Sequence, residues 1–507
     1  SEAVGKYPPC RKPLNFGYLA MAYVMGIARN QTMLLPAAVE DYISPENPVR
    51  AIDAFVDSLD LKQMGFRLRE KGDVGRDGYH PGTLLKLYLW GYFSRTRSSR
   101  RLEEACEVNL NAIWLTGDLH PDHSTISDFR KNHASLLKQI FKQFNLLCME
   151  LELFSKELVA IDGTFIKAVN SKARSFTKTK LTKLMESIDK AVAKYLLELE
   201  SADKKEQQAT LNERVQKLPA KIEKMNKRRG ELEELLKQCE ESKTGQINLT
   251  DPESRQLRKN GQATVGYNVQ TAVDDKHHMI ASCEVTQEAN DLHLLDQMAQ
   301  QAKADLNLQE DADLTVLADK GYGCPVEFAA CQEHQTQACV PMQKTPEAGD
   351  GSILEKDFSY QAQSDSYRCP EGKTLPRKAD DMGDNGTGYR VYYEAKQCRN
   401  CPVLNRCTKG NYRKFRVNIH KAAMDAVQGR LKANPKLYAK RSALVEHPFG
   451  TIKDWNGGKD LLCRGLELAE TETRLSFWAY NFKRALKVLG IKALMEGIGE
   501  WQEATAG

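Results

Sequence analysis

A strand-like segment followed by a long two-helix pattern constrains the fold of this chain most strongly. Residues 158–169 (LVAIDGTFIKAV) are apolar and β-branched, as in a buried strand, and contain one acid. Residues 175–245 then place apolar side chains three and four residues apart in two runs, separated by the polar stretch 201–210. We expect an antiparallel coiled-coil hairpin here, with a kink in its second helix at Pro219.

Strand-like runs return directly after this hairpin, at residues 263–274 and 277–287. An amphipathic helix is expected at 291–306 and an apolar strand at 314–322, followed by one more helix and one more strand. This order predicts an α/β fold with a mixed sheet and flanking helices. It excludes a TIM barrel and a doubly wound sheet with a glycine-rich phosphate loop.

Two of the predicted strands carry an aspartate in apolar surroundings. Asp162 lies within the first strand, and Asp319 follows the run LTVLA. A buried carboxylate is costly without a partner, and two neighbouring carboxylates repel each other unless cations neutralise them. A pair of Mg²⁺ ions would do so and would suit phosphoryl transfer. Taken alone, each acid could equally be an ordinary strand-end or turn aspartate.

A third acid, Glu446, stands in the predicted helix YAKRSALVEHPFGTIKDW at residues 438–455. The same segment supplies Tyr438, Arg441 and Lys453, which are donors suited to a phosphate backbone. The alternative is an exposed helix end before a proline.

Basic residues in the N-terminal part are candidates for DNA contacts. The net charge of +5 over 507 residues does not by itself indicate a nucleic-acid partner, so the argument rests on local clusters. The first four candidates lie directly after a predicted core helix at 83–93. The last two lie on a second predicted helix, for which Ser124 is the expected N-cap. A helix-turn-helix could present this second helix to the major groove. The candidates are Arg95, Arg97, Arg100, Arg101, Arg130 and Lys131. A solvated helix surface is the alternative interpretation.

Four of the 13 cysteines lie within a region of 39 residues that is rich in Gly and Asp. Cys398 and Cys401 form a C-x₂-C pair, with Cys407 shortly after it and Cys369 upstream. Four thiolates suit a structural Zn²⁺ ion. A reduced, unliganded set of surface cysteines is the alternative, and the lack of a nearby histidine argues against a catalytic thiol.

Several segments together resemble a known family. AIDGTFIKAVNSK, VGYNVQTAVD, LADKGY and VEHPFGTIK are similar to the DDE transposases of bacterial insertion sequences, in the group numbered eleven eighty-two. The stretches GYHPGTLLKLYLWGYFSRTRSSRRLE and PDHSTISDFRKNH resemble the N-terminal DNA-binding domain of that family. The resemblance runs from about residue 31 to about residue 490.

The resemblance implies an RNase H-like catalytic core in which Asp162, Asp319 and Glu446 hold two Mg²⁺ (or Mn²⁺) ions. The family signature Tyr-x₂-Arg-x₃-Glu-x₆-Lys is nearly present, but four residues rather than three separate Arg441 from Glu446. Tyr438, Arg441 and Lys453 would contact DNA.

The implied activity is cleavage and strand transfer of double-stranded DNA at the terminal inverted repeats of the element and at a target. The expected assembly is a homodimer in a synaptic complex. No membrane span is predicted, and we expect a cytoplasmic protein of the bacterial nucleoid. The alternatives are a catalytically inactive DNA-binding descendant and an RNase H-like nuclease.

The chain is therefore expected to consist of six parts. We expect an N-terminal arm (1–30), a helical DNA-binding domain (31–155), an RNase H-like core (156–174, 246–344 and 416–498), the coiled-coil hairpin (175–245), a cysteine-rich zinc-binding insert (345–415) and a C-terminal tail (499–507).

Overall fold

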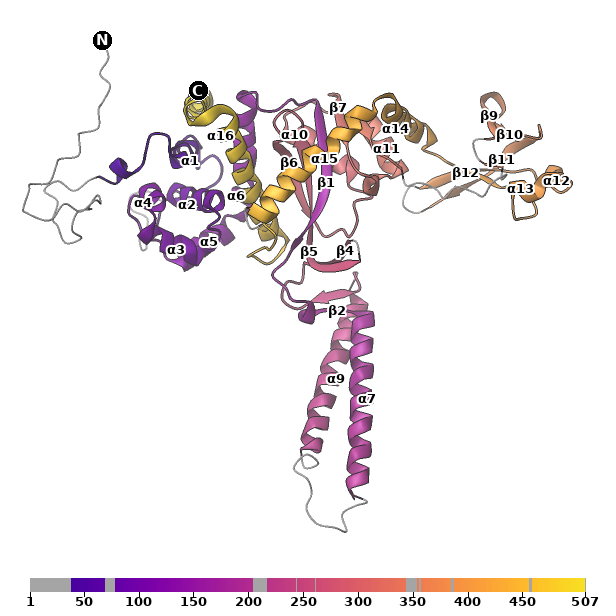
Figure 1. Cartoon of the computed structure of the whole chain (residues 1–507), viewed down its shortest axis with the longest axis horizontal. Helices are drawn as coiled ribbons and strands as arrows, with labels where there is room; N and C mark the ends of the chain where they lie inside the picture. Colours follow the sequence, from indigo (N-terminus) through magenta and orange to yellow (C-terminus); the bar gives the residue numbers. More distant parts are fainter. Residues whose placement is uncertain are drawn as a thin grey trace, which may run out of the picture.

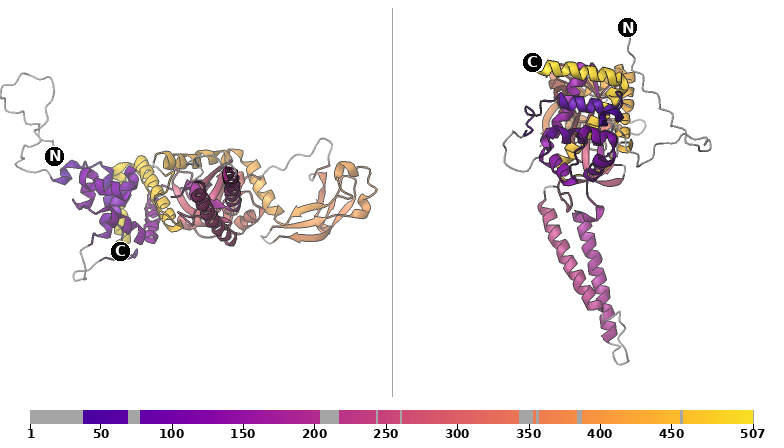
Figure 2. Two further views of the ribbon diagram at one scale, coloured as in Figure 1. Left: turned by 90° about the horizontal axis from the view of Figure 1, so that it is seen from below. Right: turned by 90° about the vertical axis from the view of Figure 1, so that its left-hand side faces the viewer.

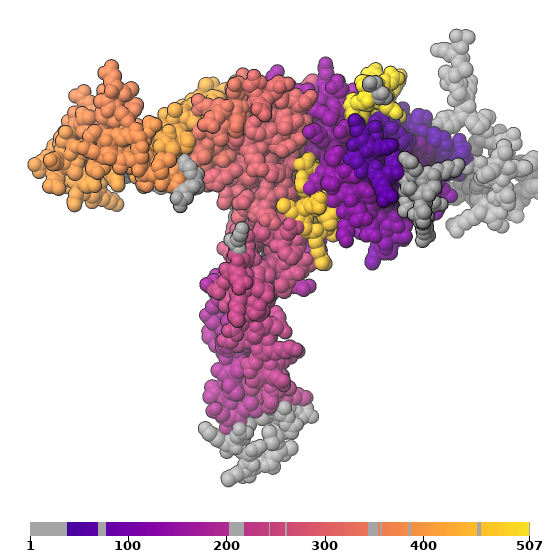
Figure 3. Space-filling view, turned by 180° about the vertical axis from the view of Figure 1, so that it is seen from behind, coloured from indigo at the N-terminus to yellow at the C-terminus, as the bar shows by residue number. Residues whose placement is uncertain are grey.

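A computed structural model describes residues 38–68, 78–203, 217–242, 244–259, 261–342, 353–354, 357–383, 387–455 and 458–506. The central sheet lies between the N-terminal helices at one end and the cysteine-rich insert at the other (Figure 1). The helical hairpin projects from the sheet as a stalk, which Figure 3 shows from behind. The predicted N-terminal arm lies outside the described residues.

The central sheet is mixed, as predicted, with the strand order β4-β5-β1-β7-β8 and β6 paired to β5. β1 pairs antiparallel with β5, and it pairs parallel with β7. β7 in turn pairs parallel with β8. The strands are β1 (Leu158–Lys167), β4 (Arg255–Lys259), β5 (Gln262–Asp274), β6 (Ile280–Thr286), β7 (Leu314–Leu317) and β8 (Thr336–Cys339).

Helices flank this sheet. Those that follow strands β6 and β7 are α10 (Leu295–Asp305) and α11 (Pro325–Glu333). The C-terminal part adds α14 (Lys421–Ala433), α15 (Pro435–Gly450), a π-helical turn (Thr451–Trp455) and α16 (Leu466–Ala506). The predicted tail at 499–507 is wrong, because α16 continues to Ala506; its one non-helical residue is Gly490, at φ 78°.

The N-terminal helices form a bundle that α16 completes. α2 is apolar nearly all round and largely buried, as predicted, and α16 packs against α1, α2 and α6. Trp478 of α16 stacks on Phe55 and Phe482 in the shared core. The bundle therefore needs residues from both ends of the chain. Its helices are α1 (Pro48–Asp57), α2 (Pro81–Ser94), α3 (Ser99–Val108), α4 (Leu110–Thr116), α5 (His123–Asn132) and α6 (Ala134–Glu150).

One cap differs from the prediction. The side chain of Asp122, not Ser124, caps α5 by accepting a hydrogen bond from the backbone N–H of Thr125 at 2.7 Å. An aspartate one residue before the helix can reach the N–H of the third helical residue, whereas Ser124 already lies within the first turn.

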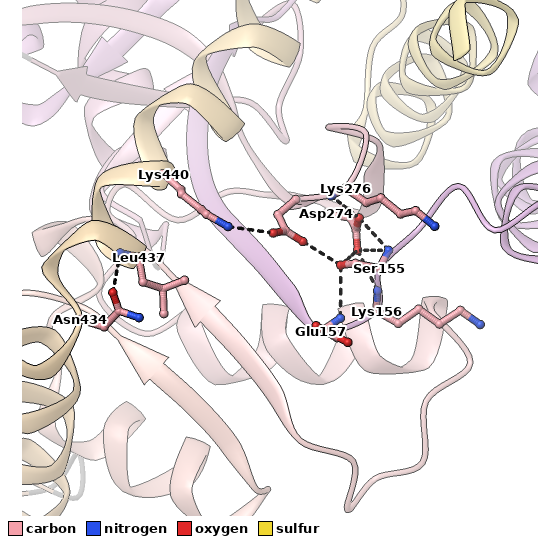
Figure 4. A network of polar contacts seen from close by, with 9 residues as sticks. Ser155, Lys156, Glu157, Asp274, Lys276, Asn434, Leu437 and Lys440 are labelled. Carbon is pink, nitrogen blue, oxygen red and sulfur yellow. Dashed lines mark hydrogen bonds and ion pairs between the residues drawn. The ribbon is translucent and has the colours of Figure 1, made fainter. Parts of the chain in front are cut away.

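The junction between the bundle and the sheet is fixed by the buried side chain of Asp274, at the end of β5 (Figure 4). Its carboxylate accepts hydrogen bonds from the backbone N–H groups of Ser155, Lys156 and Lys276, and from the Ser155 hydroxyl. Lys440 of α15 forms an ion pair with the neighbouring Asp275 at 3.3 Å. Strand β1 therefore starts from an anchored position.

The hairpin consists of α7 (Lys178–Asp203) and α9 (Leu218–Glu241), which pack along each other and rise from the short ribbon β2 (Ser175–Thr177) and β3 (Gln246–Asn248) (Figure 2). Phe176, Leu181, Leu232 and Cys239 are buried between the helices at the base. The expected kink at Pro219 is wrong, because this residue lies in the first turn of α9. A backbone N–H in the first turn has no intrahelical acceptor, so a proline there removes no helical hydrogen bond.

The cysteine-rich insert contains regular structure that the sequence pattern did not predict. Its strands form an antiparallel sheet in the order β13-β12-β11-β10-β9, with short helices α12 (Ala395–Cys398) and α13 (Leu404–Cys407) beside it. The strands are β9 (Ser359–Gln361), β10 (Ser366–Arg368), β11 (Thr374–Met382), β12 (Gly388–Tyr392) and β13 (Phe415–Asn418). The strands are short, and β11 is mostly exposed and charged, so hydrophobic alternation is weak.

Candidate active site and nucleic-acid interface

Asp162 and Asp319 are brought together by strand pairing. β1 and β7 are parallel neighbours, with Ala160 opposite Leu317, and each aspartate lies two residues beyond this last pair. Asp162 Oδ1 accepts a hydrogen bond from the N–H of Gly163 at 2.8 Å. Asp319 caps the 3₁₀ turn Lys320–Tyr322 by accepting from the N–H of Gly321 at 2.7 Å. Both carboxylates are therefore held at one edge of the sheet.

α15 packs against β1 and brings a cation to the first acid. Arg441 Nη1 lies 3.5 Å from Asp162 Oδ2. Both side chains are largely shielded from solvent. The same Nη1 atom is buried and makes no hydrogen bond with the described residues. Tyr438 lies beside Arg441, and burial raises the pKa of its hydroxyl, which is therefore a neutral donor at physiological pH.

Lys453 reaches the same strand from the π-helical turn after α15. Its Nζ donates to the Thr164 hydroxyl, and Thr164 lies two residues from Asp162, on the same face of β1. Arg441 and Lys453 thus approach this face of β1 from two consecutive elements, α15 and the π-helical turn.

Glu446 comes from α15 as well, but its side chain is exposed and makes no hydrogen bond or ion pair with the described residues. Its neighbours Leu444 and Val445 are buried against Leu158 and Ala160 of β1. Within the described part of the chain, no three His, Cys, Asp or Glu side chains are close enough to enclose a metal ion. The structure thus groups two of the three predicted acids.

Polar side chains of β5 lie beside Gly163, on the face of β1 opposite Asp162, and were not singled out from the sequence. Asn268 and Gln270 stand in the otherwise apolar strand β5, and both donate to Asp291 Oδ1, at 2.9 and 2.7 Å. Gln270 also accepts a hydrogen bond from the hydroxyl of Tyr322. Two buried amides at i and i+2 on one face of an apolar strand were the signal in the sequence, because such groups require polar partners.

The basic residues of the bundle separate into exposed and buried ones. Arg95, Arg100, Arg101 and Lys131 are exposed. Arg97 is not available to DNA in this structure, because its side chain is 10% exposed and pairs with the fully buried Glu472 at 3.0 Å. Arg130 is buried too, with its guanidinium 5.8 Å from the centre of the Tyr88 ring. The expectation of a DNA contact is therefore corrected for Arg97 and Arg130, which pack inside the bundle.

The four clustered cysteines surround one small cavity in the insert, formed by Cys369, Cys398, Cys401 and Cys407 together with apolar residues. Burial raises the pKa of the Cys407 thiol, and the other three thiols add to this effect. The backbone N–H of Lys373 donates to Cys369 Sγ at 3.3 Å. The fold thus gathers cysteines from sequence positions 38 residues apart, although among the described residues no three of these thiols lie close enough together to hold a metal ion.

Two family matches cover the bundle and the C-terminal part. Residues 37–132 match the family described as a transposase domain (DUF772), and residues 368–486 match the family described as a transposase DDE domain. These two matches support the function of a DNA transposase. Such a domain implies dependence on a divalent cation, and a transposase binds DNA.

Other comparisons add little to this assignment. Among curated proteins, none matches the chain. A solved structure of a piggyBac transposase synaptic complex with hairpin DNA is similar over 90% of this chain and 80% of that chain, at 8% sequence identity and a TM-score of 0.31. In the described part of the chain, no helix has the length and apolar character needed to cross a bilayer.

Proposed function

We propose that this transposase cleaves and joins DNA at the ends of a bacterial insertion sequence of the group numbered eleven eighty-two, with two Mg²⁺ (or Mn²⁺) ions held by Asp162, Asp319 and Glu446. The observation that carries the proposal is the register of β1 and β7, which sets the first two acids side by side with Arg441 against one of them. Its substrates are the terminal inverted repeats and a target duplex, and it acts in the cytoplasm, associated with the nucleoid.

The donor set fits hard divalent cations, since all three predicted ligands are carboxylates. When bound, such ions activate the attacking oxygen and stabilise the leaving 3′-oxygen. The residues of the chain do the positioning. Arg441 donates from its unsatisfied Nη1 atom to the phosphate beside Asp162, and Tyr438 and Lys453 contact the flanking backbone.

Four exposed side chains of the bundle, Arg95, Arg100, Arg101 and Lys131, form the proposed duplex-binding surface. The hairpin is proposed to be a coiled coil, and two subunits are proposed to meet in the synaptic complex. The RNase H-like assignment of the core is supported by the strand order, with helices on the sheet and two acids on neighbouring parallel strands.

The insert is proposed to hold one structural Zn²⁺ ion through Cys369, Cys398, Cys401 and Cys407. Four thiols around one cavity, one of them accepting a backbone N–H, have the ligand chemistry that zinc prefers. Metal analysis of the purified protein should find about one zinc per chain, and C398S should lower both this content and the stability of the insert. A purified protein without zinc, or an unchanged Tm after a chelator has removed the zinc, would contradict the assignment.

The main test compares D162N, D319N and E446Q with the wild type on a duplex that carries the element ends. Each variant should lose strand cleavage by at least 1,000-fold, as expected when an ion ligand is lost, and should still bind the duplex. E500Q, which changes an exposed glutamate on α16, is the matched control and should cleave normally.

A second duplex without inverted repeats distinguishes transposition from general nuclease activity. Equal cleavage of both duplexes would refute end-specific transposition, and cleavage by D162N would refute the ion site.

A further inference from the structure

The cysteine-rich insert divides its charge between two parts of its sequence. Residues 357–394 contain five Lys and Arg against seven Asp and Glu. Residues 395–418, from α12 to the end of β13, contain seven Lys and Arg and no Asp or Glu. The whole chain is nearly balanced, with 73 basic and 68 acidic residues, so this basic segment stands apart from it. Its cations are Lys396, Arg399, Arg406, Lys409, Arg413, Lys414 and Arg416.

Two of the seven cations stabilise the insert itself. Arg413 donates to the carbonyl of Cys407 at 2.9 Å, and its guanidinium lies 5.9 Å from the centre of the Phe415 ring. Arg416 forms an ion pair with Asp381 of β11. These two contacts give both arginines a structural role beside the thiol cavity and on the sheet.

The other five cations are exposed. Three of them, Arg399, Lys409 and Lys414, form no ion pair with a described residue. The acids of the neighbouring strands cannot neutralise them without breaking existing contacts, because these acids already have cationic partners. The pairs are Asp365–Arg377, Asp380–Arg377, Asp381–Arg416 and Glu394–Lys378.

The backbone that carries the exposed cations is folded. The N–H of Arg399 donates to the Ala395 carbonyl at 3.3 Å, and the N–H of Arg406 donates to the Val403 carbonyl at 3.0 Å. Figure 1 shows α12 and α13 at the end of the insert that lies away from the central sheet, on the opposite side of this sheet from the bundle. The positive charge is therefore presented on an ordered surface, which loses little conformational entropy when a partner binds.

Exposed cations without acidic neighbours attract a polyanion, and duplex DNA carries one negative charge per about 1.7 Å of its axis. Both family matches are to transposase domains, which favours DNA over other polyanions. We propose that the exposed cations of residues 395–418 bind the phosphate backbone of duplex DNA. This inference rests on the proposed function. It adds a second DNA-binding surface, in a segment to which only zinc binding was assigned.

The test uses R399Q/K409Q/K414Q in the full chain. Fluorescence anisotropy, without added divalent cation, measures binding of two duplexes of equal length, one with the element ends and one of unrelated sequence. The Kd should rise about tenfold or more, and the slope of log Kd against log salt should fall by about 2–3, as for the loss of up to three phosphate contacts. Zinc content and Tm should stay at the wild-type values, whereas cations that served only the thiol cluster would change both and leave Kd unchanged.

Two controls separate this surface from net charge. K183Q/K190Q/K194Q removes the same charge from exposed positions of α7 and should bind DNA normally. R399K/K409R/K414R keeps the charge and should keep the wild-type Kd. An unchanged Kd of the glutamine variant for both duplexes, or an equal loss in the α7 variant, would overturn the proposal.

The two duplexes also distinguish the source of the DNA. Weaker binding of both indicates contact with any duplex, as at a target, and weaker binding of the end duplex alone indicates contact with the element end. At saturating enzyme, the glutamine variant should still cleave the end duplex at the wild-type rate. A wild-type protein without end-specific cleavage would refute the proposed function, whereas the binding comparison would still decide the role of the basic segment.

K409E keeps the test decisive if the triple variant loses zinc or stability. Lys409 is exposed and lies in a bend between α13 and β13, so reversal of its charge should leave Tm unchanged. The Kd should rise about threefold or more, with K190E on α7 as the matched control. A folded K409E variant that binds both duplexes with the wild-type Kd would refute the role of this surface.

Discussion

Arg97 lies in a basic run that looks like a DNA-binding cluster, yet its surroundings predict that its loss destabilises the protein. Nη1 pairs with Glu472 of α16 at 3.0 Å, and Nη2 donates to the carbonyl of Asp460 at 3.1 Å. Glu472 is fully buried. R97M would leave this carboxylate without its cation while keeping most of the side-chain volume.

The magnitude follows from the remaining partners of Glu472. Breaking a buried ion pair by removing one partner costs about 3–5 kcal/mol. The N–H groups of Leu462 and Cys463 still donate to the Glu472 carboxylate, so we expect the lower end, about 3 kcal/mol. In a large domain, each kcal/mol of lost stability lowers Tm by about 2 °C, so the Tm of R97M should fall by about 6 °C.

Differential scanning calorimetry of R97M and R100M measures this effect. Arg100 is exposed on α3, three residues away, so R100M should keep the wild-type Tm and instead weaken DNA binding, with a shallower salt dependence. A double-mutant cycle of R97M with E472Q should give a coupling of about 1 kcal/mol or more. An R97M variant with normal Tm and weakened DNA binding would refute the structural role.

Three further changes test other parts of the structure. G163A should lower DNA cleavage at least tenfold in activity assays, because its Cβ atom would lie 2.4 Å from Gln270 Nε2 and 2.7 Å from Asp291 Oδ1. The control G429A should cleave normally, because a Cβ atom at Gly429 meets open space. L232A should cost about 2–5 kcal/mol in the hairpin and speed its proteolysis without changing cleavage of short DNA, since Leu232 is buried at the base of α7 and α9. His334 donates a hydrogen bond to the Asp296 carboxylate, and this bond raises the pKa of His334 above its ordinary 6.5. Its stabilisation is therefore fully present below pH 6.5 and is lost as pH rises through the higher folded pKa, and H334Q should remove this pH dependence of Tm.

The strands and the first two acids were predictable because their signals are local. An apolar, β-branched run fixes β1 and carries Asp162 with it, and the run LTVLA carries Asp319 in the same way. The pairing of β1 with β7, which brings the two acids together, is a long-range contact that the local patterns do not contain.

Other features depend on contacts that a local pattern cannot contain. Arg97 and Arg100 are indistinguishable in sequence, and what separates them is Glu472, 375 residues away. Asp291 stands in a polar stretch before a helix and gains its position only from Asn268 and Gln270 of β5. The strands of the insert were missed because short, charged, half-exposed strands lack the alternation that identifies longer ones.

The two insertions differ in how they affect the positions of the three predicted acids. The hairpin leaves the sheet after β1 and returns before β5, so it does not interrupt the direct pairing of β1 with β7 that sets Asp162 beside Asp319. Glu446, in contrast, follows the cysteine-rich insert, and its position depends on how α14 and α15 dock on the sheet. Arg430 of α14 donates to the Ala338 carbonyl of β8 at 3.0 Å, and Leu444 and Val445 of α15 pack on β1. Because the strand pair is held by main-chain hydrogen bonds and the helix by side chains, DNA or cation binding can move Glu446 at a lower free-energy cost than either aspartate.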